Sequence, residues 1–508
     1  MRFSFCVNMS SYKSVQNGSD VRGVVLGKDK TTLTPHMVKS IASAFALKLS
    51  EKSANGGGGG GGVKIGIGRD SRVTGEELTK EAMSGIASTG ATVFDLGLAT
   101  TPAMFMSTIT PGFQYSGSIM MTASHLPYDR NGMKFFTPEG GLNKSDITEI
   151  LKLAEKVDKR EVQGVRDESE GEIMEASFMP TYAELLRKHI ISEVGKGETP
   201  LKGLKIVVDA GNGSGGFFAQ DVLEPLGADT TGSQFLDPDG MFPNHVPNPE
   251  DKDAMNSIRE AVLSTKADLG VIFDTDVDRS GLVDSKGTVF NKNRLIAAMS
   301  AIALRDAPGA TIVTDSVTSD ALTRFIESMG GKHLRFKRGY KNVIEKGKEM
   351  NQLSHECPLM IETSGHGAMA ENHYLDDGAY MAVKMIVEAA RRDGDLAGLV
   401  DGFEEPLEAS EYRVKYGSDA PDGYGAKIVS DFQAFCSGKD APGGWKSAES
   451  NYEGWRVSVL DGEGWVLIRQ SLHDPLLVIN AESNVEGGVE ETMNIVNAFL
   501  VKYDELIS

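Results

Sequence analysis

One short loop of the chain carries several polar side chains of types that take part in catalysis. Residues 117–136 read GSIMMTASHLPYDRNGMKFF and place a hydroxyl (Ser124), an imidazole (His125) and an ammonium group (Lys134) between two apolar runs. A proline and a glycine break helix and central strand here, so the stretch predicts a tight turn that could hold a nucleophile rigidly. A surface turn with incidental polar residues is the alternative that these residues alone leave open.

A second stretch, residues 270–284 (GVIFDTDVDRSGLVD), places three aspartates between two apolar strands. Asp274, Asp276 and Asp278 alternate, and alternate side chains of an extended segment lie on the same side. Converging carboxylates repel one another unless a cation lies among them, and oxygen ligands suit Mg²⁺ or Mn²⁺. The alternatives are a solvated acidic turn and a haloacid-dehalogenase-type phosphatase with Asp274 as nucleophile. A calcium EF-hand is excluded, because Arg279 stands at the position of its glycine.

Apolar runs that end in an aspartate predict the buried strands that position these loops. Such runs occur at residues 63–70, 204–209 and 310–315. A small-residue turn and a helical pattern follow each run, which indicates three related α/β units. Toward the C-terminus, Trp455–Val459 and Trp465–Ile468 predict a hairpin instead.

Length and composition limit the classes of function. A chain of 508 residues is too long for one ordinary core and indicates about three to four domains. Its net charge of −20 argues against nucleic acid as the main partner, so an anionic substrate needs a local cluster of Lys and Arg. No apolar run approaches the roughly 20 residues of a membrane helix. The widely spaced Cys6, Cys357 and Cys436 form no metal or disulfide pattern and indicate a reducing compartment.

Two glycine-rich stretches have the composition of phosphate-binding loops. Residues 56–62 are all glycine, but no Lys-Ser/Thr follows them, and they predict an expanded loop. Residues 211–216 fit GxGxxG formally, but the pattern is common by chance in a glycine-rich chain and no further half of a dinucleotide-binding fold is evident, so we reject it. The first 19 residues contain no acid, which leaves a transit-peptide remnant and a disordered terminus open.

The first stretch resembles the phosphoserine loop TASHNPxxxNGxK of the α-D-phosphohexomutases, with Leu126 in place of the usual Asn. The acidic stretch resembles the family's metal loop, Asp-Gly-Asp-Gly-Asp-Arg, with two glycines replaced. The resemblance implies that phosphorylated Ser124 and the three aspartates bind one Mg²⁺ per subunit. It further implies that Arg22 and Arg279 spread the charge of the transferring phosphoryl group, and that His125 and Lys134 transfer protons.

Three further motifs extend the resemblance to substrate binding. Lys341 lies in a basic turn that faces the sugar phosphate in the family. Residues 361–367 (IETSGHG) resemble the family's sugar-selecting loop, which implies roles for Glu362, Ser364 and His366. Residues 469–475 (RQSLHDP) resemble its phosphate-binding loop Arg-x-Ser-Asn-Thr-x-Pro, which implies that Arg469 and Ser471 bind phosphate; Leu472 and His473 replace the usual Asn and Thr.

The resemblance covers nearly the whole chain and implies the four-domain phosphohexomutase architecture, with three mixed α/β domains and a smaller, sheet-rich C-terminal domain around one cleft. We place these domains at residues 1–198, 199–307, 308–406 and 407–508. The implied activity interconverts hexose 1-phosphate and hexose 6-phosphate, of glucose or mannose, with hexose 1,6-bisphosphate as intermediate and activator. Phosphoglucosamine mutase, a Mg²⁺-dependent phosphatase and a non-catalytic sugar-phosphate binder remain alternatives. We expect a cytoplasmic or plastid location, and the oligomeric state stays open.

Overall fold

The computed structural model describes residues 11–27, 31–55, 62–166, 171–417, 420–439, 441–471 and 475–507. Residues 56–61 of the predicted glycine loop (56–62), as well as Cys6, Leu472 and His473, lie outside the described residues. The chain forms two compact units: unit 1 comprises Met1–Asn291 with Ser364–Ala397, and unit 2 comprises Lys292–Thr363 with Gly398–Ser508. Our four domain boundaries stay a prediction.

The N-terminal part of unit 1 is an α/β layer structure. Its strands are β1 (Gln16–Asn17), β2 (Asp20–Val24), β3 (Lys64–Arg69), β4 (Thr92–Leu98), β5 (Gly117–Met121), β6 (Arg130–Thr137), β7 (Gly140–Gly141) and β8 (Ile173–Glu175). Its helices are α1 (Pro35–Asn55), α2 (Gly75–Ala87), α3 (Thr101–Ile109), α4 (Lys144–Asp158) and α5 (Met179–Val194). The described strands pair in the order β1-β2-β6-β5-β3-β4-β8, with β7 beside β6.

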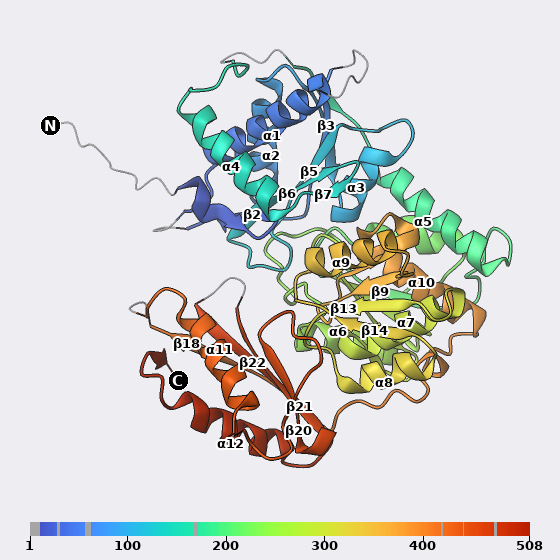
Figure 1. Cartoon of the computed structure of the whole chain (residues 1–508). Helices are drawn as coiled ribbons and strands as arrows, with labels where there is room; N and C mark the ends of the chain where they lie inside the picture. Colours follow the sequence, from blue (N-terminus) through green and yellow to red (C-terminus); the bar gives the residue numbers. More distant parts are fainter. Residues whose placement is uncertain are drawn as a thin grey trace. The chain divides into compact units, whose positions relative to one another are not determined.

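Helices cover both faces of this sheet (Figure 1). Helices α1, α2 and α4 lie on one face, where Phe45, Ile67 and Ile150 belong to one buried cluster. Helix α3 lies on the other face, and its Met104 packs against Gly68 of β3. Strands β3 and β5 are parallel, whereas β6 runs antiparallel to β5, so the loop between β5 and β6 returns at the end of the sheet where β3 also ends.

The second part of unit 1 builds the acidic loop. Its elements are β9 (Ile206–Asp209), α6 (Lys252–Thr265), β10 (Leu269–Phe273), β11 (Ser280–Asp284), β12 (Val289–Phe290), β16 (Gly367–Met369), β17 (Leu375–Asp376) and α10 (Gly378–Arg391). Strand β10 runs parallel to β9 and antiparallel to β11, so residues 274–279 form the connection of a buried hairpin.

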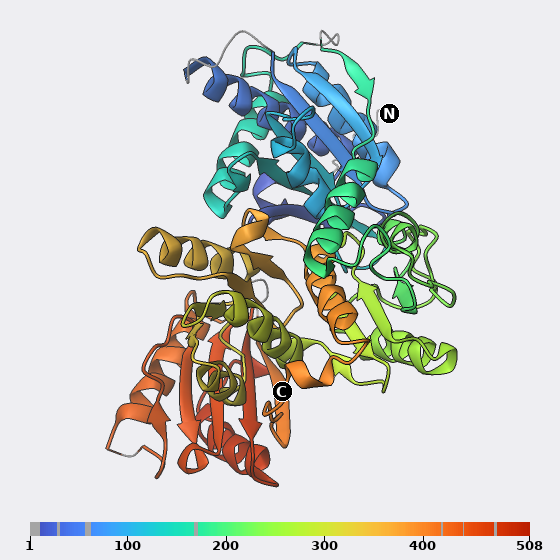
Figure 2. The same cartoon turned by 90° about the vertical axis from the view of Figure 1, so that its right-hand side faces the viewer.

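Residues 364–397 return to unit 1 from far along the chain. Helix α10 packs against α5, and the two lie side by side in Figure 2, α10 in orange and α5 in green. Arg391 forms an ion pair of 2.9 Å with Glu193, and Lys196 donates to the carbonyl of Ala390. Asp377 caps α10 by accepting from the amide of Tyr380 at 2.9 Å.

Unit 2 combines a parallel α/β part with an antiparallel part. The first has α7 (Lys292–Asp306), β13 (Thr311–Thr314), α8 (Asp320–Ser328), β14 (Lys332–Arg335), α9 (Tyr340–Gln352) and β15 (Leu359–Ile361), with β13 between β14 and β15. The second has β18 (Glu408–Tyr416), α11 (Tyr424–Ser437), β19 (Lys446–Ser447), β20 (Trp455–Val459), β21 (Gly464–Gln470), β22 (Leu476–Ser483), α12 (Gly488–Leu500) and β23 (Leu506–Ile507). The predicted hairpin is confirmed as β20–β21.

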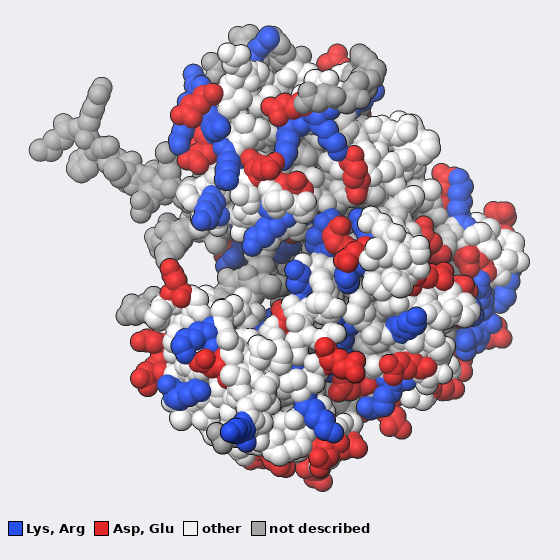
Figure 3. All heavy atoms as spheres, viewed as in Figure 1, with Lys and Arg blue, Asp and Glu red and all other residues white. Residues whose placement is uncertain are grey.

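Two further observations bear on partners. On the face shown in Figure 3, Lys and Arg are intermixed with Asp and Glu. Among the described helices, none has the length and apolarity that crossing a bilayer requires.

Candidate active site

Ser124 occupies a strained position at the start of the loop between β5 and β6. Its backbone φ is +54°, in the left-handed region that residues with a Cβ rarely adopt. The hydroxyl of Thr122 accepts from the Ser124 amide at 2.8 Å, and the side chain of Ser124 is almost fully buried. A strained, over-determined residue of this kind is typical of functional sites.

The Ser124 hydroxyl meets the acidic loop directly. It donates to Asp274 Oδ2 at 3.0 Å, and Arg279 Nη2 donates to it at 2.8 Å. The same arginine donates to Asp274 Oδ2 through Nε and Nη2, at 3.0 and 2.8 Å. The serine of the first motif therefore forms one hydrogen-bonded cluster with the aspartate and the arginine of the acidic motif.

The three aspartates converge, although not for the reason that we predicted. Residues 274–279 form a turn instead of an extended segment, with Val277 at a φ of +66°. Helix α10 begins against this turn: the Gly378 amide donates to the carbonyl of Val277 at 3.1 Å, and a Cβ at Gly378 would lie 2.6 Å from the backbone of Arg279. Oxygen atoms of the three carboxylates nevertheless lie within 4.8 Å of one another.

The glycine-rich turn at 211–216 supports the acidic loop from another side. The Ser214 amide donates to the carbonyl of Thr275 at 2.8 Å, and a Cβ at Gly213 would lie 2.6 Å from the same carbonyl oxygen. Glycine is therefore required at this position by a close approach of two backbones.

Lys134 and Thr101 supply donors to the acidic cluster. Lys134 Nζ donates to Asp276 Oδ2 at 2.9 Å and also forms an ion pair with Asp278. Thr101, at the start of α3, donates its hydroxyl to the same Asp276 oxygen at 2.5 Å. The other oxygens, Asp276 Oδ1 and Asp278 Oδ1, are buried without a hydrogen-bond partner. Buried oxygens of this kind fit ligation of a hard divalent cation such as Mg²⁺.

His125 lies beside the serine. Its Nδ1 is 3.3 Å from Ser124 Oγ and 2.5 Å from Arg279 Nη2. The positive charge of Arg279 and burial lower the pKa of His125 to about 2, so the imidazole is neutral. Arg22, the other predicted charge-spreading residue, lies on β2 and pairs with Asp20 at 2.9 Å.

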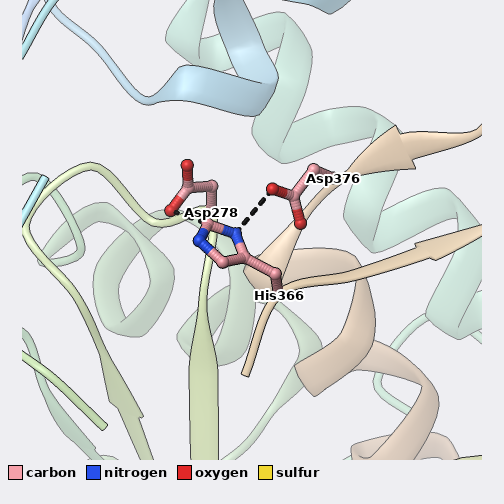
Figure 4. Close-up of side chains that lie close together, drawn as sticks. All are labelled: Asp278, His366 and Asp376. Atoms are coloured by element: carbon pink, nitrogen blue, oxygen red, sulfur yellow. Dashed lines mark hydrogen bonds and ion pairs between the residues drawn. The ribbon is translucent and has the colours of Figure 1, made fainter. Parts of the chain in front are cut away.

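His366 belongs to a second cluster that shares Asp278 (Figure 4). Its Nδ1 lies 2.6 Å from Asp376 Oδ2 and 3.9 Å from Asp278 Oδ1, and its backbone forms a bridge with Arg279. Burial disfavours the charged imidazole, but the carboxylates of Asp376 and Asp278 outweigh burial and raise the pKa of His366 to about 9. The histidine is therefore a cation that links the predicted sugar-recognition loop to the acidic loop.

Unit 2 holds the remaining predicted residues, apart from Ser364, which begins the second segment of unit 1. Glu362 Oε1 accepts from the amide of Gly339 at 2.7 Å, so the basic turn and the glutamate are adjacent. Lys341 pairs with Glu345 at 3.2 Å, one turn along α9. Arg469 is almost fully buried, with Nη1 3.5 Å from Glu453 Oε1, and the Ser471 amide donates to the carbonyl of Leu476.

The sequence of the chain matches family models and known proteins over most of its length. Models described as phosphoglucomutase/phosphomannomutase alpha/beta/alpha domains I, II and III match residues 13–161, 181–287 and 291–406. A phosphomannomutase/phosphoglucomutase of Pseudomonas putida is 28% identical over 494 residues, covering 97% of this chain and 96% of that protein. A phosphoglucomutase of Neisseria gonorrhoeae is 28% identical over 96% of this chain and 97% of its own length.

The fold agrees with these relatives. A solved structure of a phosphoglucomutase/phosphomannomutase family protein from Burkholderia thailandensis superimposes with a TM-score of 0.77 at 26% identity. The superposition covers 97% of this chain and 98% of that one. The predicted fold class, three mixed α/β domains followed by a sheet-rich region, is confirmed by these matches.

Proposed function

Because this chain belongs to the phosphoglucomutase/phosphomannomutase family and is a hexose-phosphate mutase, we propose that Ser124 carries the phosphoryl group that it transfers. The observation that supports this assignment is the contact of the Ser124 hydroxyl with both Asp274 and Arg279 in a buried, strained loop. A serine in this position has a cation and a candidate metal site within reach of any phosphate bound to it.

In the proposed reaction a hydroxyl oxygen of the sugar attacks the phosphorus atom of phosphorylated Ser124. A bond from that oxygen to phosphorus forms, the bond from phosphorus to Ser124 Oγ breaks, and the hydroxyl proton passes to Oγ. The product is a hexose 1,6-bisphosphate, which turns and returns its other phosphoryl group to the serine. Net transfer converts hexose 1-phosphate to hexose 6-phosphate.

The nitrogen groups of the site take different parts in this reaction. We assign the proton transfer to His125, because its neutral ring lies 3.3 Å from Ser124 Oγ. Lys134 donates to two aspartates, so we give it the role of a fixed counter-charge beside the acidic loop. Arg279 already contacts Oγ and offers a planar fork to the oxygens of a phosphoryl group. Arg22 is assigned to the same task.

Mg²⁺ is the metal that we propose for the acidic loop, with Asp274, Asp276, Asp278 and the serine phosphate as ligands. When bound, it would supply a positive charge beside the transferring phosphoryl oxygens. The donor set contains oxygen alone, which suits a hard cation. Hexose 1,6-bisphosphate is the proposed activator, because it can phosphorylate the serine.

We assign substrate binding to the residues of the remaining motifs. Arg469 and Ser471, together with Lys341, bind the phosphate that is not reacting, and Glu362, Ser364 and His366 bind sugar hydroxyls. Glucose and mannose phosphates are the proposed substrates, in keeping with the names of the relatives in Pseudomonas and Neisseria. The phosphatase alternative is disfavoured, because the relatives that match nearly the whole chain are named phosphomannomutase/phosphoglucomutase and phosphoglucomutase.

The proposal is tested by replacing Ser124→Ala and following a coupled assay with glucose 1-phosphate, mannose 1-phosphate and glucosamine 1-phosphate. Turnover of glucose or mannose phosphate by the wild type and its loss in the variant support the mutase. Mass spectrometry after incubation with glucose 1,6-bisphosphate should find the phosphoryl group on Ser124. Phosphate on Asp274 would instead identify a phosphatase, and binding of hexose phosphates without turnover would identify a silent binder.

A further inference from the structure

Arg72, which no sequence motif singled out, donates hydrogen bonds to the backbone of the Ser124 loop. Its side chain is completely buried. Nη1 donates to the carbonyls of Pro127 and Arg130 at 2.8 and 2.9 Å, and Nη2 donates to the carbonyls of Leu126, at 2.6 Å, and Ser124. One guanidinium group therefore binds three carbonyl oxygens of the loop between β5 and β6 and the carbonyl oxygen of Arg130, the first residue of β6.

The guanidinium group is itself fixed from the sheet. Asp70 follows β3, and its amide donates to the carbonyl of Met121 at the end of β5. Its carboxylate lies 3.3 Å from Arg72 Nε and accepts from the Arg72 amide at 3.0 Å. The ring of Phe242 covers the guanidinium group, with 5.3 Å between its centroid and Cζ. Arg72 thus connects the rigid end of two strands to the loop.

These contacts meet a need that the loop creates. The carbonyl of Ser124 is buried and the carbonyls of Leu126, Pro127 and Arg130 are partly buried. Leaving a buried carbonyl without a donor is unfavourable. Ser124 also holds a left-handed backbone conformation, with its amide bound by Thr122 and its carbonyl by Arg72. Both peptide groups that flank the serine are therefore fixed, and this fixes the direction of Cβ and Oγ.

We propose that Arg72 is a positioning residue, which holds the Ser124 loop so that Oγ keeps its place between Asp274 and Arg279 for phosphoryl transfer. This inference rests on the proposed function of Ser124. The role requires arginine, because the planar fork directs donors from two nitrogens toward four acceptors. The compact ammonium group of lysine offers three donors from a single point.

The test compares Arg72→Lys with the wild type at saturating Mg²⁺. We expect kcat to fall by about 10²-fold, the usual effect of misplacing a reacting group by roughly 1 Å, with KM changed less than about threefold. The rate at which glucose 1,6-bisphosphate phosphorylates Ser124, followed by intact-protein mass, should fall by the same factor. Arg69→Gln is the matched control: Arg69 ends the same strand, pairs with Glu76 at 2.9 Å, and should leave both rates unchanged.

A second readout does not depend on turnover. Amide hydrogen exchange of residues 124–130 should become faster in Arg72→Lys, while exchange in α1 and α6 stays as in the wild type. If Arg72→Lys does not fold, Asp70→Asn takes its place, because it keeps the guanidinium group and removes its anchor; we then expect a loss of kcat of about tenfold.

Different results separate the two ideas. If the wild type turns over no hexose phosphate, the proposed function fails, and hydrogen exchange alone decides whether Arg72 holds the loop. If the wild type is active, unchanged exchange in the loop overturns the positioning role. The positioning role would also be overturned if Arg72→Lys kept the kcat of the wild type per folded molecule and had only a lower melting temperature. Arg72 would then support folding alone.

Discussion

The pairing of His366 with Asp376 makes a quantitative prediction. The pKa of His366 is raised from 6.5 to about 9, because the nearby carboxylates outweigh burial. That difference corresponds to about 3 kcal/mol in favour of the charged ring. Asp376, whose Oδ2 lies 2.6 Å from Nδ1, makes the largest favourable contribution, whereas Asp278 is 3.9 Å away. We therefore expect Asp376→Asn to bring the pKa of His366 to 6.5 or below.

The assay is NMR of protein that carries ¹³C-labelled histidine, titrated from pH 5 to 10 in EDTA so that no metal competes for Asp278. The chain has nine histidines, and His366→Gln identifies the signal. Asp377→Asn is a matched control, because Asp377 is the neighbouring buried aspartate and its side chain contacts Tyr182 instead of the histidine. A wild-type His366 that titrates near 6.5, or an unchanged value in Asp376→Asn, would refute the reasoning.

The same pair predicts a direction for stability. Because the folded-state pKa of His366 lies above the unfolded value, its contribution is fully present below about pH 6.5 and is lost as the pH rises through about 9. The melting temperature of the metal-free wild type should therefore fall across this range more than that of Asp376→Asn. An equal fall in both proteins would show that other groups cause it.

Two further predictions concern the metal and the phosphate-binding arginine. EDTA should abolish hexose-phosphate interconversion and Mg²⁺ should restore it, and activity that persists in EDTA would exclude the metal role. Asp276→Asn should weaken Mg²⁺ binding, measured by calorimetry, by at least roughly tenfold. Glu453→Gln should raise KM for glucose 1-phosphate about tenfold, because Glu453 lies 3.5 Å from Arg469 and also accepts from Ser316. Replacement of the exposed Glu449 by Gln should leave KM unchanged.

Local residue patterns predicted the strands and loops of the site well, because these elements depend mainly on residues that are close together in the sequence. Apolar runs ending in aspartate became β3, β9 and β13, and the alternation of three aspartates correctly indicated a carboxylate cluster. The route to that cluster was wrong. We expected extended backbone, whereas a turn with Val277 at positive φ brings the carboxylates together, and this turn depends on the distant Gly378.

The residues that sequence reasoning missed act on the backbone or across long distances in the chain. Arg72 contacts main-chain carbonyls, which carry no residue identity, so no spacing of side chains could reveal it. Thr101 reaches Asp276 across 175 positions, and its only local signal is a Thr-Thr-Pro sequence at a helix start. Asp376 and Asp377 are adjacent in the sequence, but Asp376 is the partner of His366, whereas Asp377 caps α10.

The residues of the predicted sugar-selecting loop, 361–367, contact two different parts of the fold. The boundary between the compact units falls between Thr363 and Ser364, inside the loop. Glu362 is bound through its carboxylate to Gly339, at the start of α9, whereas His366 is bound to Asp376 and to the backbone of the acidic loop. A sequence motif records only that these residues are close along the chain. Because their partners differ, the carboxylate of Glu362 and the imidazole of His366 are oriented by different parts of the fold.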